Sequence, residues 1–202
     1  YASKEHLSRW CKAVLTEFPD FGIVGEIWHT RPGTVAYWQD GFDTYDGYKS
    51  NLQSVIDFPL SHSIGSALRK DSRPSDIRKI YDILTQDLIY PDPKNNFIFL
   101  DNHDSDRFFN VVGENINKYK IGIALLLTLR GIPQFYYGTE INLTGKRSRG
   151  DAFVRKDFPG GWKNDKRNAF TAKGRTEEEN EIWDFCSKLL NWRKNNKVIH
   201  KG

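Results

Sequence analysis

The feature that most constrains this chain is a short apolar run that ends directly in four polar side chains. Phe97-Ile-Phe-Leu100 is followed at once by Asp101-Asn-His-Asp104. An apolar run of this length, rich in aromatic and branched residues, is typical of a strand buried on both faces. In α/β proteins the active-site residues gather at the carboxyl ends of such strands. The polar residues at 101–104 are therefore candidate site residues.

A second apolar run, at residues 21–28, also carries an acid at its end. This acid is Glu26, which stands between Gly25 and Ile27 with Trp28 next in the chain. Two carboxylates on two buried strand ends, far apart in sequence, favour one shared site. The alternative is that each acid caps the next helix or binds a loop.

Helical and strand patterns alternate along the rest of the chain. Cap and stop signals support several of these assignments, such as Ser3 as the N-cap of the first helix and a capping box formed by Thr176 and Glu179. The expected helices are residues 3–18, 34–39, 60–68, 75–88, 117–129 and 176–194, and the expected strands are residues 21–28, 54–58, 97–100 and 134–137. Residues 142–173 form a long, charged and glycine-rich stretch, which predicts a functional or disordered loop.

This alternation predicts βα units around a parallel sheet. A closed (β/α)8 barrel takes eight strands and about 250 residues. The 202 residues of this chain, with four expected strands, therefore predict about half of such a barrel. A small doubly wound sheet also fits the pattern. It usually carries a phosphate loop, and the chain contains neither G-x-G-x-x-G nor a Walker sequence.

Composition excludes several classes of protein. The 30 basic and 26 acidic residues are scattered and give a net charge of +4, which argues against a nucleic-acid partner. No apolar run reaches transmembrane length, so no membrane partner is expected.

Tyr1 opens no signal peptide, and the missing start methionine favours a piece of a longer protein. Cys11 and Cys186 lie in separate helical patterns and are interpreted as buried free thiols.

Four stretches, in order along the chain, resemble a known enzyme family. Gly25-Glu-Ile-Trp28 and Phe99-Leu-Asp-Asn-His-Asp104 resemble two signature motifs of the α-amylase family, glycoside hydrolase family 13. Residues 131–140 resemble its eighth barrel strand, and residues 55–60 are similar to the sixth strand of its neopullulanase and cyclomaltodextrinase branch. The resemblance implies that residues 1–202 are a single partial domain. That domain would be the C-terminal half of a (β/α)8 TIM barrel, about strands five to eight with their flanking helices.

The resemblance also implies an activity and roles for named residues. The protein would be part of a retaining α-glucan hydrolase that cleaves α-1,4-glucosidic bonds in starch-derived oligo- or polysaccharides. Glu26 would be the general acid/base, Asp104 the carboxylate that stabilises the transition state, and His103 a sugar-binding residue. The further substrate-binding candidates are Trp28, Asn102 and Tyr137.

Aromatic faces stack on sugar rings, which adds Trp38 and Tyr136 as candidates, although core or loop packing is the alternative for each. Arg107 either orients the loop of Asp104 or forms a surface ion pair. In the family the nucleophile is an aspartate shortly after an arginine on the fourth strand. The helix at Ser3 resembles the helix that follows that strand. The nucleophile is therefore expected just before Tyr1, and the fragment alone is expected to be inactive.

A retaining glycosidase uses two carboxyl groups about 5–5.5 Å apart. One of them stays protonated near neutral pH, which requires surroundings that disfavour the anion. The apolar neighbours of Glu26 in the sequence suit that role. Calcium binding and a secreted or periplasmic location are implied by the family resemblance alone. An open half-barrel also predicts a homo-oligomer formed through unpaired sheet edges.

Two other classes of function are weighed against this reading. A non-catalytic amylase-like scaffold or transporter-associated subunit would tend to lose the catalytic acids, and both Glu26 and Asp104 are present. A metal phosphohydrolase built on His103 and Asp104 would need further histidines with ligand spacing. The remaining histidines are spread along the chain, at positions 6, 29, 62 and 200. The preferred glucan, the linkage and the choice between hydrolysis and transfer stay open.

Overall fold

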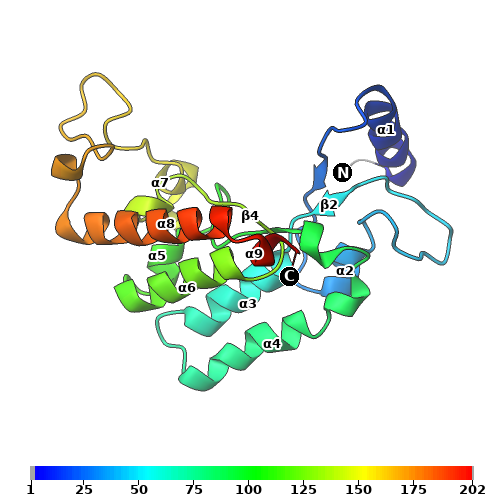
Figure 1. The fold of residues 1–202 in the computed structure, drawn as a ribbon, viewed down its shortest axis with the longest axis horizontal. Coiled ribbons are helices and arrows are strands. Elements are labelled where there is room, and N and C mark those ends of the chain that lie inside the picture. The colour runs from blue at the N-terminus through cyan, green and yellow to red at the C-terminus, as the bar shows by residue number, and fades with distance from the viewer. Residues whose placement is uncertain (1–2, 202) are drawn as a thin grey trace. The chain divides into compact units, whose positions relative to one another are not determined.

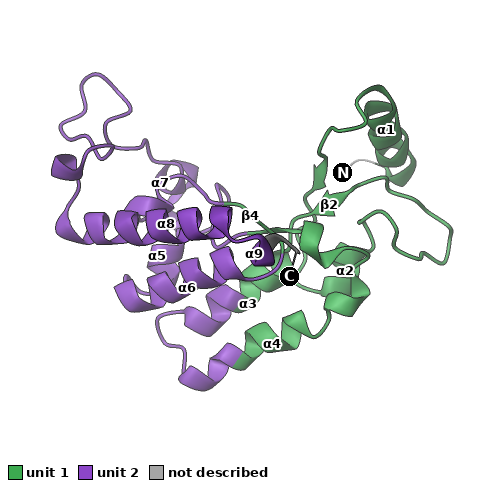
Figure 2. Cartoon of the chain, viewed as in Figure 1, with its two compact units in different colours: residues 1–63, 78–98, 131–134 green, residues 64–77, 99–130, 135–202 purple. Residues whose placement is uncertain are grey.

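The computed structural model describes residues 3–201, apart from the side chains of residues 200 and 201. Tyr1, Ala2 and Gly202, and the side chain of His200, lie outside the described part. The chain divides into two compact units, shown in Figure 2. Unit 1 comprises Tyr1–Ser63, Arg78–Ile98 and Gly131–Gln134, and unit 2 comprises Ile64–Ile77, Phe99–Arg130 and Phe135–Gly202.

Unit 1 contains a sheet of short parallel strands, which confirms the predicted βα alternation. The strands pair in parallel as β1 with β2 and β3 with β4, and an isolated parallel bridge between Ile56 and Phe97 links the two pairs. Because all the strands run the same way, their carboxyl ends lie at one edge. The bounds are Val24–Gly25 for β1, Ser54–Val55 for β2, Phe97–Ile98 for β3 and Ile132–Pro133 for β4.

The last strand lies two residues earlier than predicted, at Ile132–Pro133 in place of 134–137. The backbone N–H of Ile132 donates to the Asn96 carbonyl at 2.8 Å, and that of Gln134 donates to the Ile98 carbonyl at 2.7 Å. Pro133 falls between them, at the position whose nitrogen faces away from β3. A proline is tolerated there because no ladder hydrogen bond is lost.

The helices of unit 1 cover this sheet with small apolar clusters. Helix α1 spans Lys4–Glu17, and the Ser3 hydroxyl caps it by accepting from the His6 N–H at 3.2 Å, as predicted. Helix α2 spans Pro32–Ala36. Helix α3 starts in unit 1 and spans Phe58–Leu68. Trp38 packs against two buried clusters, one of Cys11, Ile23 and Leu52 and one of Val35, Ala36, Val55 and Tyr90, so core packing is its role.

The single helix predicted at 75–88 is broken into shorter pieces. These are η1 Pro74–Ile77, α4 Arg78–Leu84 and η2 Asp87–Ile89, followed by η3 Pro93–Asn95. Beyond α4, the side chains of Thr85 and Gln86 both donate to the carbonyl of Asp82, at 3.1 and 2.8 Å. Such side-chain bonds compete with continuation of the helix.

Unit 2 is built mainly of helices, and α6 and α8 pack side by side in it (Figure 1). Asn115 caps α6, and the predicted capping box of Thr176 and Glu179 opens α8. The Phe108 ring of α5 fills the space that a Cβ at Gly122 of α6 would take. Because glycine has no Cβ, the two helices pack closely. The bounds are Phe108–Val111 for α5, Ile116–Thr128 for α6, Asp151–Val154 for α7, Glu177–Asn195 for α8 and Lys197–Lys201 for α9.

The long stretch at 142–173 is an ordered part of unit 2 and contains short helices. Besides α7 it includes η5 Arg147–Arg149, and η4 Thr139–Ile141 and η6 Ala172–Gly174 lie at its two ends. Cys11 and Cys186 are free and buried, as predicted. Among the described residues, no helix is both long and apolar enough to cross a membrane.

Candidate active site

Glu26 lies one residue beyond β1, at the carboxyl edge of the unit 1 sheet. The Gly25 carbonyl accepts from the Ile56 N–H at 2.9 Å, which fixes the strand up to that point. A Cβ on Gly25 would lie 2.7 Å from a Leu52 methyl carbon, so this close approach requires glycine. The Glu26 side chain is exposed, and its carboxylate has no hydrogen bond or ion pair within residues 3–201.

The apolar surroundings predicted for Glu26 are not found in unit 1. Successive side chains of an extended segment point to opposite faces. Gly25 and Ile27 therefore turn away from Glu26, Gly25 towards Leu52 and Ile27 towards the buried cluster that contains Val55. Glu26 shares its face with Val24 and Trp28, which are both exposed. The Trp28 ring leans on the Phe58 ring, with 4.6 Å between centroids, and leaves 57% of the residue accessible to solvent.

Asp104 sits on a tight turn in unit 2, beyond the end of β3. The Asn102 side-chain oxygen accepts from the Asp104 N–H at 2.9 Å, and the Ser105 hydroxyl accepts from the Asn102 N–H at 2.9 Å. Asn102 is buried. Its side chain therefore builds the turn that presents Asp104.

Both carboxylate oxygens of Asp104 have partners. One oxygen lies 3.2 Å from His103 Nε2, and the other lies 2.6 Å from Arg155 Nη2. Arg155 Nε also donates to the His103 carbonyl at 2.9 Å. The guanidinium therefore fixes the side chain of Asp104 and the backbone of its turn together.

Arg155 is the residue that sequence reasoning missed. It also pairs with Asp151 at 3.0 Å, and Asp151 pairs in turn with Arg147, so both pairs join residues four apart. That spacing was the one local signal available. Nothing in it indicates that Arg155 reaches Asp104, a residue 51 positions away.

Arg107 does not form the surface ion pair that was one of its two predicted roles. Its side chain is buried, and Nη1 donates to the Tyr137 carbonyl at 2.7 Å. Its guanidinium carbon lies 3.9 Å from the Tyr136 ring centroid and 4.9 Å from that of Tyr137. Arg107 therefore anchors the segment that follows β4, by a hydrogen bond and by cation–π contacts.

The two tyrosines of that segment hold the chain around Arg155. The Tyr137 hydroxyl donates to the carbonyl of Lys156 at 2.9 Å, and the Tyr136 hydroxyl lies 3.5 Å from that of Val154. Tyr137 is 40% exposed, which leaves part of its ring open to a ligand.

Asp101, the first acid of the motif, is a buried structural group. It accepts from the Phe108 N–H at 2.8 Å, at the start of α5, and from the Thr139 hydroxyl at 3.4 Å. Its burial raises its pKa to about 6, against an ordinary value of 3.8. The helix-capping alternative therefore applies to Asp101. Asp57, just before α3, caps that helix in the same way, because its carboxylate accepts from the Leu60 N–H at 2.9 Å.

Unit 2 also contains an apolar cavity of about 450 Å³ between η4 and α8. Phe135, Trp183 and Leu190 line it, together with Tyr137 and Glu140. Burial raises the pKa of Glu140. Neither His103 nor Asp104 lines this cavity. Most of its lining is apolar, whereas the cluster around Asp104 contains charged side chains, so the cluster is the better candidate for a catalytic site.

The structure thus joins His103, Asp104 and Asn102 by direct contacts and links Tyr137 to them through the Arg155 segment. Glu26 and Trp28 belong to the other unit. The pocket shared by Glu26 and Asp104 therefore stays a prediction. Among the side chains that the structure describes, no group of three or more His, Cys, Asp or Glu is arranged to hold a metal ion.

Comparisons with known proteins agree with the sequence motifs. The family model described as "Alpha amylase, catalytic domain" matches residues 2–202. The Beta/alpha-amylase of Paenibacillus polymyxa is 30% identical over 186 residues, which cover 89% of this chain and 13% of that protein. Neopullulanase 2 of Thermoactinomyces vulgaris is 34% identical over 131 residues, which cover 63% of this chain and 20% of that protein.

A solved structure is also similar along the full length of the chain. The α-amylase of Geobacillus thermoleovorans, crystallised in complex with acarbose, superposes with a TM-score of 0.74 at 26% identity. The match covers 100% of this chain and 40% of that one. This chain therefore spans well under half the length of the relatives it matches.

Proposed function

Because the chain belongs to the α-amylase catalytic-domain family, glycoside hydrolase family 13, we propose that it is the C-terminal half of a retaining α-glucan hydrolase barrel. Its substrates would be α-1,4-linked oligo- or polysaccharides derived from starch. The observation that carries the proposal is the Asp104 carboxylate, held on both oxygens by His103 and Arg155 beyond a strand end. A structural acid needs no such presentation on a partly exposed turn.

Asp104 would stabilise the transition state by hydrogen bonds to sugar hydroxyls. Such bonds accelerate the reaction only if they are stronger in the distorted, cationic ring than in the bound substrate. A carboxylate whose orientation is fixed beforehand loses little freedom when the reaction occurs. Arg155 and Asn102 would supply that fixed orientation, and His103 would bind the same sugar.

Glu26 would act as the general acid and base. It would first protonate the oxygen of the leaving sugar, and then take a proton from the water that releases the glycosyl group. This role needs surroundings poorer in water than those of Glu26 in unit 1. We propose that the part of the barrel outside this chain covers Glu26, since the chain spans 40% of a related amylase.

The nucleophile would come from the same missing part, as an aspartate just before Tyr1. It would attack the anomeric carbon and form a glycosyl-enzyme intermediate with inverted configuration. Attack by water from the opposite side then restores the original configuration. Without the nucleophile, residues 1–202 alone should not hydrolyse maltooligosaccharides.

The decisive experiment replaces Glu26 by Gln in the full-length protein. We expect hydrolysis of maltooligosaccharides to fall by orders of magnitude. We expect a smaller loss on α-maltosyl fluoride, because fluoride leaves with little help from an acid. The matched control is Glu17→Gln, a second exposed glutamate of unit 1, which should keep full activity. Near-normal turnover of Glu26→Gln on oligosaccharides would reject the assignment. A full-length protein with no activity would support the non-catalytic scaffold instead.

A further inference from the structure

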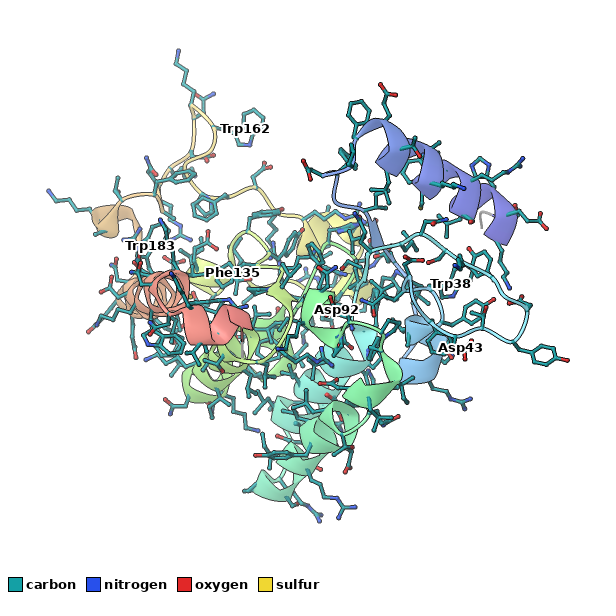
Figure 3. All side chains as sticks on the ribbon, turned by 45° about the vertical axis from the view of Figure 1, so that its right-hand side comes forward. Trp38, Asp43, Asp92, Phe135, Trp162 and Trp183 are labelled. Atoms are coloured by element: carbon teal, nitrogen blue, oxygen red, sulfur yellow. The ribbon has the colours of Figure 1, made fainter. Side chains whose placement is uncertain are left out.

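Unit 2 contains a tryptophan, Trp162, whose side chain is largely exposed to solvent. Trp162 is 66% exposed and lies on the outer part of the loop that follows α7 (Figure 3). Phe170, on the same loop, is 58% exposed, and its ring packs against that of Phe158 with 4.6 Å between centroids. The Trp162 ring has no ring contact within the described residues, so both the apolar face and the indole N–H are available to a ligand.

The backbone around Trp162 is fixed by its own hydrogen bonds. The Asp165 carboxylate accepts from the N–H groups of Gly160 and Trp162, at 2.6 and 3.2 Å. The Asp165 N–H donates in turn to the Trp162 carbonyl at 3.1 Å. Gly160 has φ +99°, and a Cβ there would lie 2.4 Å from the Asn168 side chain. Trp162 therefore stands on a shaped turn.

The loop is also fastened to α8. Arg167 makes a two-pronged ion pair with Glu179, at 2.6 and 2.8 Å. Burial opposes ionisation of Glu179, but the Arg167 guanidinium outweighs it and holds the pKa of that carboxyl below its ordinary value. Arg175 lies over the Trp183 ring at 4.0 Å and donates to the Ala169 carbonyl at 2.9 Å. Ala169 is fully buried. These contacts stabilise the loop without using Trp162.

We infer that Trp162 is a stacking platform for a pyranose ring of an α-1,4-glucan, outside the site of bond cleavage. The inference rests on the function proposed above, which supplies the class of ligand. The apolar C–H face of a glucose ring matches the indole face, and its hydroxyls need polar partners at the rim. Lys163, Asn164 and Lys166 are exposed and close to Trp162 in the sequence, and they would supply such partners.

The position of the loop predicts which substrates use the platform. Arg155 contacts Asp104, and Trp162 follows it by seven positions, a span of at most roughly 25 Å of extended chain. Within the described residues, no hydrogen bond or ring contact joins Trp162 to Asp104, His103 or Arg155, so a glucan that occupies both places is longer than one bound at Asp104 alone. Long chains should therefore bind through Trp162, and short oligosaccharides should not.

The test measures retardation of the full-length protein in native gels that contain soluble starch, compared with gels without it. We expect Trp162→Ala to bind starch about tenfold more weakly, a change of about 1.4 kcal/mol. Trp162→Phe, which keeps an aromatic face, should restore most of the retardation. The matched control is Trp192→Ala, which removes an exposed tryptophan from α8 and should migrate as the wild type does.

Circular dichroism would show that each variant is folded, and turnover of maltotriose should be unchanged in Trp162→Ala. Equal retardation of Trp162→Ala and the wild type would overturn the inference and leave the proposed function intact. Absence of retardation in the wild type would overturn it as well. The proposed function fails separately, through full activity of Glu26→Gln.

Discussion

The two carboxylates proposed for catalysis differ in how their own units hold them. Asp104 is joined to His103 and Arg155, and Asn102 shapes its turn. Glu26 leaves β1 with no hydrogen bond or ion pair to its carboxylate within the described part of the chain. Both acids follow buried strands, so strand position alone does not determine the environment of an acid.

The difference fits the two roles. A group that stabilises charge in the transition state works best when its orientation is fixed beforehand. A group that gives up a proton and takes one back must tolerate both states, and strong permanent partners would oppose that exchange. The fixed Asp104 carboxylate is therefore consistent with the role of transition-state stabiliser, and the absence of ion pairs at Glu26 within its unit is consistent with the role of acid/base.

The largest effect expected in unit 2 is that of Asp104→Asn in the full-length enzyme. The amide keeps the shape of the side chain but loses the charge that faces the developing positive ring. We expect kcat on maltooligosaccharides to fall about 10²–10³-fold, with KM nearly unchanged. A variant that raises KM and keeps kcat would show that Asp104 binds substrate without stabilising the transition state. Asp184→Asn, an exposed acid on α8, is the control.

Asp101 extends the comparison to a buried acid that serves structure. Its pKa is about 6 in the folded chain against an ordinary 3.8, so between these values the folded state binds more protons than the unfolded state. Stability should therefore fall as pH rises through this window, by about 3 kcal/mol from this group. Asp101→Asn should lack that fall. Urea unfolding of both proteins from pH 4 to 7 measures it, and parallel curves would contradict the assigned burial effect.

Arg155→Ala would remove one of the two partners of the Asp104 carboxylate and so make its environment more like that of Glu26, which has no ion pair within the described residues. The carboxylate would keep His103 as a neighbour but lose the contact that fixes it, so we expect kcat to fall about tenfold through misplacement. Arg155→Lys keeps the charge without the two-pronged geometry and should recover only part of the loss. Arg147→Ala removes the other arginine that pairs with Asp151 and is the control. Unchanged kcat in Arg155→Ala would show that Asp104 is positioned without Arg155.

The sequence predicted the elements that depend on local signals. The Ser3 cap, the capping box at Thr176 and the alternation of helices with parallel strands follow from neighbouring residues, and the structure confirms them. The bounds of β4 were predicted two residues too late because apolar character extends to Tyr137, whereas the paired residues are those whose N–H groups reach β3.

The site was harder to predict than the fold. Arg155 approaches Asp104 across 51 positions, and no local pattern records such a contact. The apolar neighbours of Glu26 were misleading because alternate residues of an extended segment face opposite ways. Residues Gly25 and Ile27 contribute to the core below β1 and leave Glu26 uncovered.

The smallest expected effect concerns self-association through β1 or β4, the two outer strands of the unit 1 sheet, which expose different backbone groups. The Gly25 carbonyl accepts from the Ile56 N–H beyond β2, and the Ile23 N–H donates to the side chain of Gln53, just before β2. The backbone N–H and C=O of Val24, between them, therefore face the outer side of β1. The outer side of β4 presents Pro133, which has no N–H to donate. We therefore expect residues 1–202 on their own to associate through β1. Light scattering should show Val24→Pro shifted towards monomer and Val24→Ile, which keeps the N–H, unchanged. Association that persists in Val24→Pro, or a wild-type chain that is monomeric, would reject β1 as the interface.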